Sequence, residues 1–315
     1  MFRTLAIEAM MLLLFNRTGN AQVSSSPSAD KPSAKATARF TITFAKSPYA
    51  DFLFYLLFRN TGQYPDLATA VAITDIRPLD SSSFLPEDSI ISGVANYGAL
   101  YELATHHDEA AHLGDMLKRA EPRYPAFYSF WQQRVGPDED KTATLWARQE
   151  VEWNPISHLE EMERLKFPFS SIQIDLLALD PQGSSMQGPP TIFTTLDVPS
   201  LAWAIGHEGT HMMVGPNGAN WTARKSGDEA ARLMRANGGS DYDVEEALCL
   251  LMQAKMSIAS GATAKDFRTS DRLKPSPRKT LLIALENDWE AYTKSPNINA
   301  ADWLIAETLE SLGKR

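Results

Sequence analysis

Two histidines and a glutamate lie within five consecutive residues in the second half of the chain. His207, Glu208 and His211 form the pattern H-E-x-x-H. On an α-helix, side chains four residues apart share one face, so both imidazoles can bind the same metal ion. Glu208 is then free to polarise a water molecule at the metal instead of binding the ion itself. The pattern predicts a site for one Zn²⁺ per chain and hydrolytic chemistry.

The residues around this motif are apolar. Between Leu201 and Met213, Glu208 is the only acidic side chain and there is no lysine or arginine. Burying a carboxylate beside two histidines is costly unless an opposite charge compensates it, and a metal ion is the simplest such charge. Asp197 or Ser200 can cap the start of the helix, and Gly215 follows its end. A structural helix with hydrogen-bonded core histidines is the alternative interpretation.

Hydrophobic spacing predicts an α+β fold that is predominantly α-helical. Alternation with a period of two predicts a strand over residues 40–44, and runs rich in β-branched and apolar residues predict strands over 172–176 and 191–196. Helical spacing recurs over residues 48–59, 96–104, 107–119, 124–133, 142–165, 228–236, 243–260, 276–292 and 300–312. The predicted sheet therefore comes just before the H-E-x-x-H helix in the chain.

This order of short strands, H-E-x-x-H helix and further helices resembles the zincin metallopeptidases. The resemblance covers residues of about 190 to 255 and implies a zincin-like domain with a small sheet before the metal helix, acting on a peptide or protein substrate. It also implies an edge strand that binds the substrate backbone, a part that would fall to residues 191–196. Asn217 stands where a metzincin has its third histidine. The resemblance is therefore to the gluzincins, whose third ligand is a glutamate on a second helix.

The third zinc ligand is predicted to be Glu246. The segment Glu246-Ala-Leu-Cys is similar to the gluzincin pattern of a glutamate followed by small and apolar residues. Glu245 lies on a more apolar face of the same predicted helix and remains an alternative, and Glu229 is a more distant one. Either glutamate of the pair could instead be an ordinary residue of a helix's first turn. Asp243, or whichever of the pair is not the ligand, can accept a hydrogen bond from a ligand imidazole.

In such a site Glu208 acts as general base and then as general acid. Tyr242, close to the ligand helix, is the predicted oxyanion donor, with Tyr292 as an alternative. Two other functions stay open: an exported zinc-containing binding protein without catalysis, and a structural helical domain with a chance motif. Two polar patches are predicted to be exposed faces rather than further sites; they are His106, His107 and His112, and Asp138-Glu139-Asp140.

Composition restricts the partners and the compartment. The net charge of -9 over 315 residues speaks against nucleic acid and anionic membranes as partners. Residues 1–21 resemble a secretory signal peptide, residues 22–38 a disordered linker rich in Ser, Pro and Ala, and residues 39–315 a single domain. The single cysteine, Cys249, excludes an internal disulfide and is expected to be buried. These features favour a periplasmic or secreted bacterial protein that is not inserted in the membrane after signal removal.

Overall fold

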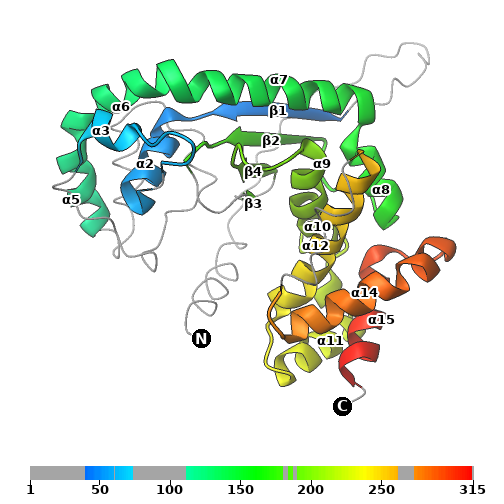
Figure 1. The fold of residues 1–315 in the computed structure, drawn as a ribbon. Coiled ribbons are helices and arrows are strands. Elements are labelled where there is room, and N and C mark those ends of the chain that lie inside the picture. The colour runs from blue at the N-terminus through cyan, green and yellow to red at the C-terminus, as the bar shows by residue number, and fades with distance from the viewer. Residues whose placement is uncertain are drawn as a thin grey trace, which may run out of the picture.

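The computed structural model describes residues 40–59, 61–73, 111–179, 184–186, 190–261 and 273–313. Helices dominate this part of the chain (Figure 1), which confirms the predicted α+β, mainly helical class. The helices are α2 (Pro48–Phe58), α3 (Leu67–Val71), α5 (Ala111–Ala120), α6 (Tyr124–Phe130), α7 (Gly136–Trp153), α8 (Pro155–Glu163), α9 (Leu201–Ala204), α10 (Thr210–Val214), α11 (Lys225–Ala236), α12 (Asp241–Ala259), α14 (Pro277–Lys294) and α15 (Ala300–Gly313). Short π-helical turns join α6 to α7 (Trp131–Val135) and α9 to α10 (Ile205–Gly209), and 3₁₀ turns span Glu121–Arg123 and Trp221–Ala223.

The sheet has four strands in the order β1-β2-β4-β3. They are β1 (Thr41–Lys46), β2 (Ser171–Leu176), β3 (Ser184–Met186) and β4 (Thr191–Thr194). β1, β2 and β4 run parallel, whereas β3 is antiparallel to β4. The strand predicted over residues 191–196 exists, but its expected place at the sheet edge is wrong. A short strand, β3, pairs with the outer side of β4 and takes the edge.

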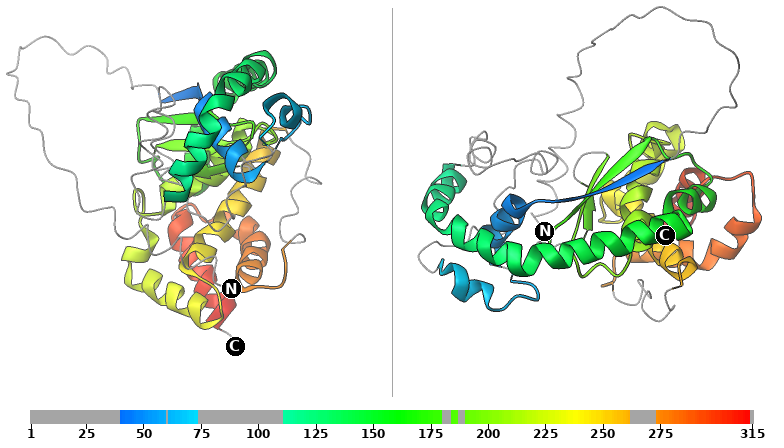
Figure 2. Two further views of the ribbon diagram at one scale, coloured as in Figure 1. Left: turned by 90° about the vertical axis from the view of Figure 1, so that its left-hand side faces the viewer. Right: turned by 90° about the horizontal axis from the view of Figure 1, so that it is seen from above.

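The long helix α7 runs along β1, the strand at the other edge of the sheet (Figures 1 and 2). Lys46 at the end of β1 binds Asp140 of α7 at 2.6 Å. The single helix predicted over residues 142–165 is wrong. α7 ends at Asn154, which adopts a left-handed conformation (φ 46°), and α8 begins at Pro155. A helix cannot continue through this pair, because the proline removes a backbone donor and restricts the residue before it.

Two hydrophobic cores lie along the sheet. The larger joins Ile172, Ile174 and Leu176 of β2 to apolar side chains of α7–α12, α14 and α15. The smaller encloses the inner faces of α2, α3, α5 and α6 together with Leu177 and Phe193. Figure 1 shows α2 to α6 at one end of the sheet and α9 to α15 below the other.

The smaller core also holds a pair of acidic side chains, Asp51 of α2 and Glu139 of α7, each with 0% of its surface exposed. The prediction that the patch Asp138–Asp140 forms a solvated face is therefore wrong for Glu139, which lies on the inner side of α7.

Several predictions lie outside the described residues. These are the signal peptide (residues 1–21), the linker (22–38), the helix over 96–104, the first part of the helix over 107–119, and the side chains of His106, His107 and His112. In the part of the chain that the structure describes, no helix is both long enough and apolar enough to cross a bilayer.

Candidate metal centre

The H-E-x-x-H segment forms a buried helical rod that contains a π-helical turn. Ser200 caps its start by accepting a hydrogen bond from the Trp203 amide at 3.2 Å, and Gly215 ends it. Between α9 and α10, the π-helical turn Ile205–Gly209 widens the helix at His207 and Glu208. The expected uninterrupted α-helix is therefore corrected to an α–π–α rod. Such turns insert an extra residue into a helix and change the direction of the side chains around it.

Helix α12 packs against this rod without intervening side chains. A Cβ atom added at Gly206 would lie 2.9 Å from the Gln253 Cα and 3.0 Å from the Met252 carbonyl oxygen, so only glycine allows this approach. The start of α12 is held by a capping box, in which the Ser240 hydroxyl accepts from the Asp243 amide and the Asp243 carboxylate accepts from the Ser240 amide at 2.8 Å. The close approach and the fixed start bring Glu246 opposite the two histidines.

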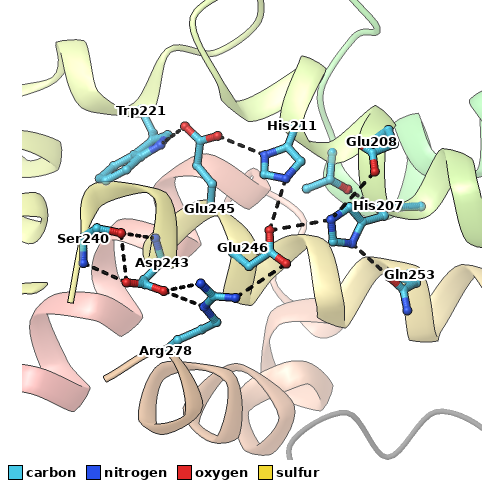
Figure 3. Close-up of polar contacts among 12 residues, drawn as sticks. His207, Glu208, His211, Trp221, Ser240, Asp243, Glu245, Glu246, Gln253 and Arg278 are labelled. Carbon is cyan, nitrogen blue, oxygen red and sulfur yellow. Dashed lines mark hydrogen bonds and ion pairs between the residues drawn. The ribbon is translucent and has the colours of Figure 1, made fainter. Parts of the chain in front are cut away.

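Three potential ligand atoms converge between the rod and α12 (Figure 3). Oε2 of Glu246 lies 3.6 Å from Nε2 of His207 and 3.4 Å from Nε2 of His211. Zinc–ligand bonds of about 2.0–2.2 Å in a tetrahedron place ligand atoms about 3.4 Å apart. The distances from Oε2 of Glu246 to the two imidazole nitrogens therefore suit a zinc ion between them.

Each histidine is oriented by a second hydrogen bond on its other ring nitrogen. Nδ1 of His207 lies 2.9 Å from Oε1 of Gln253, and Nδ1 of His211 lies 3.2 Å from Oε2 of Glu245. Glu245 in turn accepts a hydrogen bond of 2.6 Å from Nε1 of Trp221. Because amide and carboxylate oxygens accept, both Nδ1 atoms carry protons, and Nε2 is the nitrogen of each ring that faces Glu246 and can bind a metal ion when the ring is neutral. Outer contacts of this kind are typical of metal-binding histidines.

The electrostatics of the three residues fit a cation. Glu246 is only 8% exposed, and its buried Oε2 atom has no hydrogen-bond partner among the described residues. Burial raises the pKa of this carboxyl, but His207 and His211 outweigh burial and hold the pKa well below its usual range. Burial lowers the pKa of His207, but the charges of Glu208 and Glu246 outweigh it and raise the pKa above its usual value. The cluster therefore attracts positive charge, supplied by protons or by a metal ion.

Glu208 lies beside this cluster rather than opposite it. Ligand atoms of His207, Glu208 and His211 lie within 4.8 Å of one another, and Oε1 of Glu208 is 3.9 Å from Nε2 of His207. Glu246 is nearer to that nitrogen and also close to the second histidine. This arrangement suits Glu246 as the third ligand and leaves Glu208, only 2% exposed, for proton transfer.

The remaining sequence candidates fall into two groups. Tyr242 belongs to the site, since its ring stacks on His211 with centroids 5.6 Å apart and 43% of the residue is exposed. Tyr292 does not, because its hydroxyl donates to the Met162 carbonyl oxygen at 2.9 Å. Glu229 is exposed on α11. Cys249 is buried as expected, and burial raises the pKa of its thiol to about 12, so the thiol is neutral.

A further acidic residue, Glu163, contacts the helical rod that carries His207 and His211. Oγ1 of Thr210 lies 2.5 Å from Oε1 of Glu163 and 2.7 Å from the Gly206 carbonyl oxygen in the π-helical turn. A hydroxyl carries one hydrogen and cannot donate fully to both oxygens, so a proton on Glu163 removes the conflict. Burial raises the pKa of Glu163 to about 8, which agrees with a neutral acid at this position.

The sequence interpretation missed four residues that support the site. Gln253 was detectable, since it lies seven residues after Glu246 and therefore on the same face of α12. Trp221, Glu163 and Arg278 have no such signal, because each comes from a separate element that only the tertiary structure brings to the helical rod or to α12.

Comparison of the chain with protein-family models, curated proteins and solved structures finds no match. The interpretation of the site therefore rests on its geometry.

Proposed function

We propose that the protein is a zinc-dependent hydrolase of peptide bonds, with His207, His211 and Glu246 as zinc ligands and Glu208 as general base. The observation that carries the proposal is the convergence of two imidazole nitrogens and one buried carboxylate oxygen, 3.4 and 3.6 Å apart. Three protein ligands and an open fourth position are the usual arrangement of catalytic zinc, whereas structural zinc sites usually have four protein ligands.

A zinc ion held by these residues would act as a Lewis acid toward a carbonyl oxygen and lower the pKa of a coordinated water to about 7. Glu208 accepts the proton of the attacking water and passes it to the leaving amine. Its position on the π-helical turn keeps its carboxylate close to His207, with Oε1 3.9 Å from Nε2. Gln253 and Glu245 hold the two imidazoles in the tautomer that leaves Nε2 free to bind.

Tyr242 is the candidate donor to the developing oxyanion. It is the partly exposed side chain stacked on His211, and burial raises the pKa of its hydroxyl above the usual value, so it stays protonated. A protonated phenol can donate a hydrogen bond to an oxygen that gains negative charge.

The test separates metal binding from catalysis. Full-length chain and the variant Glu208→Gln are purified without chelator or histidine tag, and zinc is measured by elemental mass spectrometry alongside cleavage of a quenched-fluorescence peptide library. We expect about one zinc per chain in both proteins and a loss of cleavage of about 100- to 10,000-fold in the variant, the size expected for a general base. Glu229→Gln, an exposed glutamate on α11, is the matched control and should retain both.

Two outcomes would contradict the proposal. Hydrolysis that survives Glu208→Gln would remove Glu208 from the mechanism. Stoichiometric zinc with no cleavage by the wild-type chain would favour the non-catalytic zinc-binding protein instead.

A further inference from the structure

Arg278, at the start of α14, connects the first turn of α12 to Glu246 and the two histidines that face it (Figure 3). Its Nε atom donates to Oδ1 of Asp243 at 2.6 Å, and Nη2 lies 2.5 Å from the same oxygen. Nη1 faces Oε1 of Glu246 at 3.7 Å. The guanidinium also lies over the ring of Tyr242, 5.8 Å from the centroid. One side chain therefore contacts the cap of α12, the carboxylate of Glu246 and the aromatic ring beside His211.

The two oxygens of Glu246 have different surroundings as a result. Oε1 faces the guanidinium, whereas Oε2 faces the two imidazoles and has no hydrogen-bond partner among the described residues. A carboxylate on a flexible glutamate can rotate and present either oxygen, or both, to a metal ion. A cation on the Oε1 side favours the one orientation in which Oε2 alone points into the cluster.

Arg278 is itself held in place. Asp243 accepts from Ser240 through Oδ2, at 2.8 Å from the amide and 2.9 Å from the hydroxyl, and binds Arg278 through Oδ1. Each of the three guanidinium nitrogens faces a carboxylate oxygen, and only 26% of the side chain is exposed. These engagements argue against a role as a free cation that binds substrate.

We infer that Arg278 is a positioning residue of the metal site, which orients Glu246 for single-oxygen coordination through a Ser240–Asp243–Arg278–Glu246 chain. The inference rests on the proposed function only in assuming that Glu246 is a zinc ligand. It does not require the site to hydrolyse anything.

The sign of the effect on zinc affinity separates this role from simple electrostatics. A guanidinium near a dication repels it, so removing the charge alone would tighten zinc binding. Removing a group that orients a ligand weakens binding, typically by 10- to 100-fold. The two explanations predict opposite changes for the same variant.

The experiment titrates metal-free full-length protein with Zn²⁺ in competition with a chromophoric chelator, and records the visible spectrum with Co²⁺ in place of zinc. We expect Arg278→Met to weaken zinc binding about 10- to 100-fold and to change the Co²⁺ spectrum, with partial recovery in Arg278→Lys. The matched control is Arg235→Met, which removes an exposed ion pair between α11 and Asp241 in the same first turn of α12. It should change the affinity by less than about 3-fold, because it does not contact Glu246.

Unchanged or tighter zinc binding in Arg278→Met would overturn the inference. If that variant fails to fold by circular dichroism, Arg278→Lys decides, since a lysine keeps the charge but cannot bridge two carboxylates in the same geometry. An affinity of Arg278→Lys equal to that of the wild type would then overturn it. If the variants change zinc affinity as expected but the wild-type chain cleaves no peptide, the result contradicts the proposed function and supports the inference. A wild-type chain that binds no zinc overturns both.

Discussion

The two cores of the molecule both bury carboxyl groups, but they neutralise them differently. In the larger core, one oxygen of Glu246 faces the Nε2 atoms of two histidines. In the smaller core, Asp51 and Glu139 face each other with no histidine between them. The first cluster needs positive charge from outside, as a metal ion or as protons on the imidazoles. The second can be neutralised by one proton shared within the pair.

The contacts of Asp51 and Glu139 in the smaller core indicate which of the two carboxyl groups is ionised. Asp51 accepts from Nε1 of Trp131 at 2.8 Å and from the Leu179 amide at 3.0 Å, and both bonds favour its charged form. Neither carboxyl oxygen of Glu139 has a hydrogen-bond partner in the described part of the chain, and burial together with the charge of Asp51 raises the pKa of Glu139 to about 12. Glu139 is therefore the member that holds the proton, whereas burial raises the pKa of Asp51 and the two donors favour its anionic form. An acidic residue far from a motif can thus be structural, whereas two imidazole nitrogens beside one carboxylate oxygen distinguish the candidate metal centre.

Glu163 tests whether a proton can neutralise a carboxyl in the larger core as well. Its pKa is raised from 4.5 to about 8 by burial, so between these values the folded state keeps a proton that the unfolded chain releases. The unfolding free energy of the metal-free protein should therefore fall as the pH rises from 5 to 9, by about 4 kcal/mol from this group. Glu163→Gln should remove that part of the slope in urea unfolding. Exposed Glu161→Gln should leave it, and an identical slope in wild type and Glu163→Gln would contradict the assignment.

Asp51→Asn probes the charged member of the smaller pair. The amide nitrogen would face either the Trp131 indole or the Leu179 amide, so one donor would lose its acceptor inside the core. We expect a loss of about 3 kcal/mol in unfolding free energy, measured by urea denaturation. Zinc affinity should be unchanged, because the pair belongs to the other core. A loss as small as that caused by Glu139→Gln would show that Asp51 is not the ionised member.

The same substitution in the two cores gives the sharpest contrast. Glu246→Gln should weaken zinc binding at least about 100-fold, equivalent to about 2.7 kcal/mol, because it removes an anionic ligand. Glu139→Gln should leave zinc binding unchanged and cost less than about 1 kcal/mol of stability, since an amide resembles the neutral acid. Glu245→Gln should weaken zinc binding about 10-fold, as an outer partner of His211. A larger effect at Glu245 than at Glu246 would reverse their roles.

Two glycines of the metal rod provide the smallest contrast. A Cβ at Gly206 would meet backbone atoms of α12, whereas a Cβ at Gly209 would meet the end of the Leu159 side chain at 2.7 Å. Gly206→Ala should cost about 2 kcal/mol and weaken zinc binding, because α12 must move away with Glu246. Gly209→Ala should cost less than about 1 kcal/mol, since the Leu159 methyl group can shift and alanine favours the helix. Both are measured by thermal unfolding and zinc titration, and equal effects would contradict the close packing of α12.

Residue type and spacing predict the centre of the site but not its surroundings. His207, Glu208 and His211 are recognisable because few arrangements of such residues in an apolar helix are tolerated without a compensating charge. The sequence favoured Glu246 over Glu245 as the third ligand by only a small margin. Both residues lie in one turn of α12, and the choice depends on how that helix is rotated against the rod. Arg278 and Trp221 were not predictable, since neither shares a helix face or a motif with the ligands.

Individual helices and strands could be predicted from the sequence, but which elements lie next to one another could not. The strand at residues 191–194 follows from its threonine, isoleucine and phenylalanine residues, but its interior place depends on β3, three residues that carry no distinct pattern. The burial of Glu139 depends on Asp51, a residue of a different helix. Acidic runs such as Asp138–Asp140 are usually solvated, and only the tertiary partner distinguishes the exception.

The parallel pairing of β1 with β2 has a consequence for how the protein folds. Thr43 and Ile172, hydrogen-bonded neighbours in the sheet, are 129 residues apart in sequence. Closing so long a loop costs conformational entropy before any contact repays it, and such non-local pairing slows folding. The rod that carries His207 follows this sheet in the chain, and Glu246 arrives later still, on α12. If the site binds zinc as proposed, we therefore expect zinc binding to be a late kinetic step, completed only after the sheet has closed.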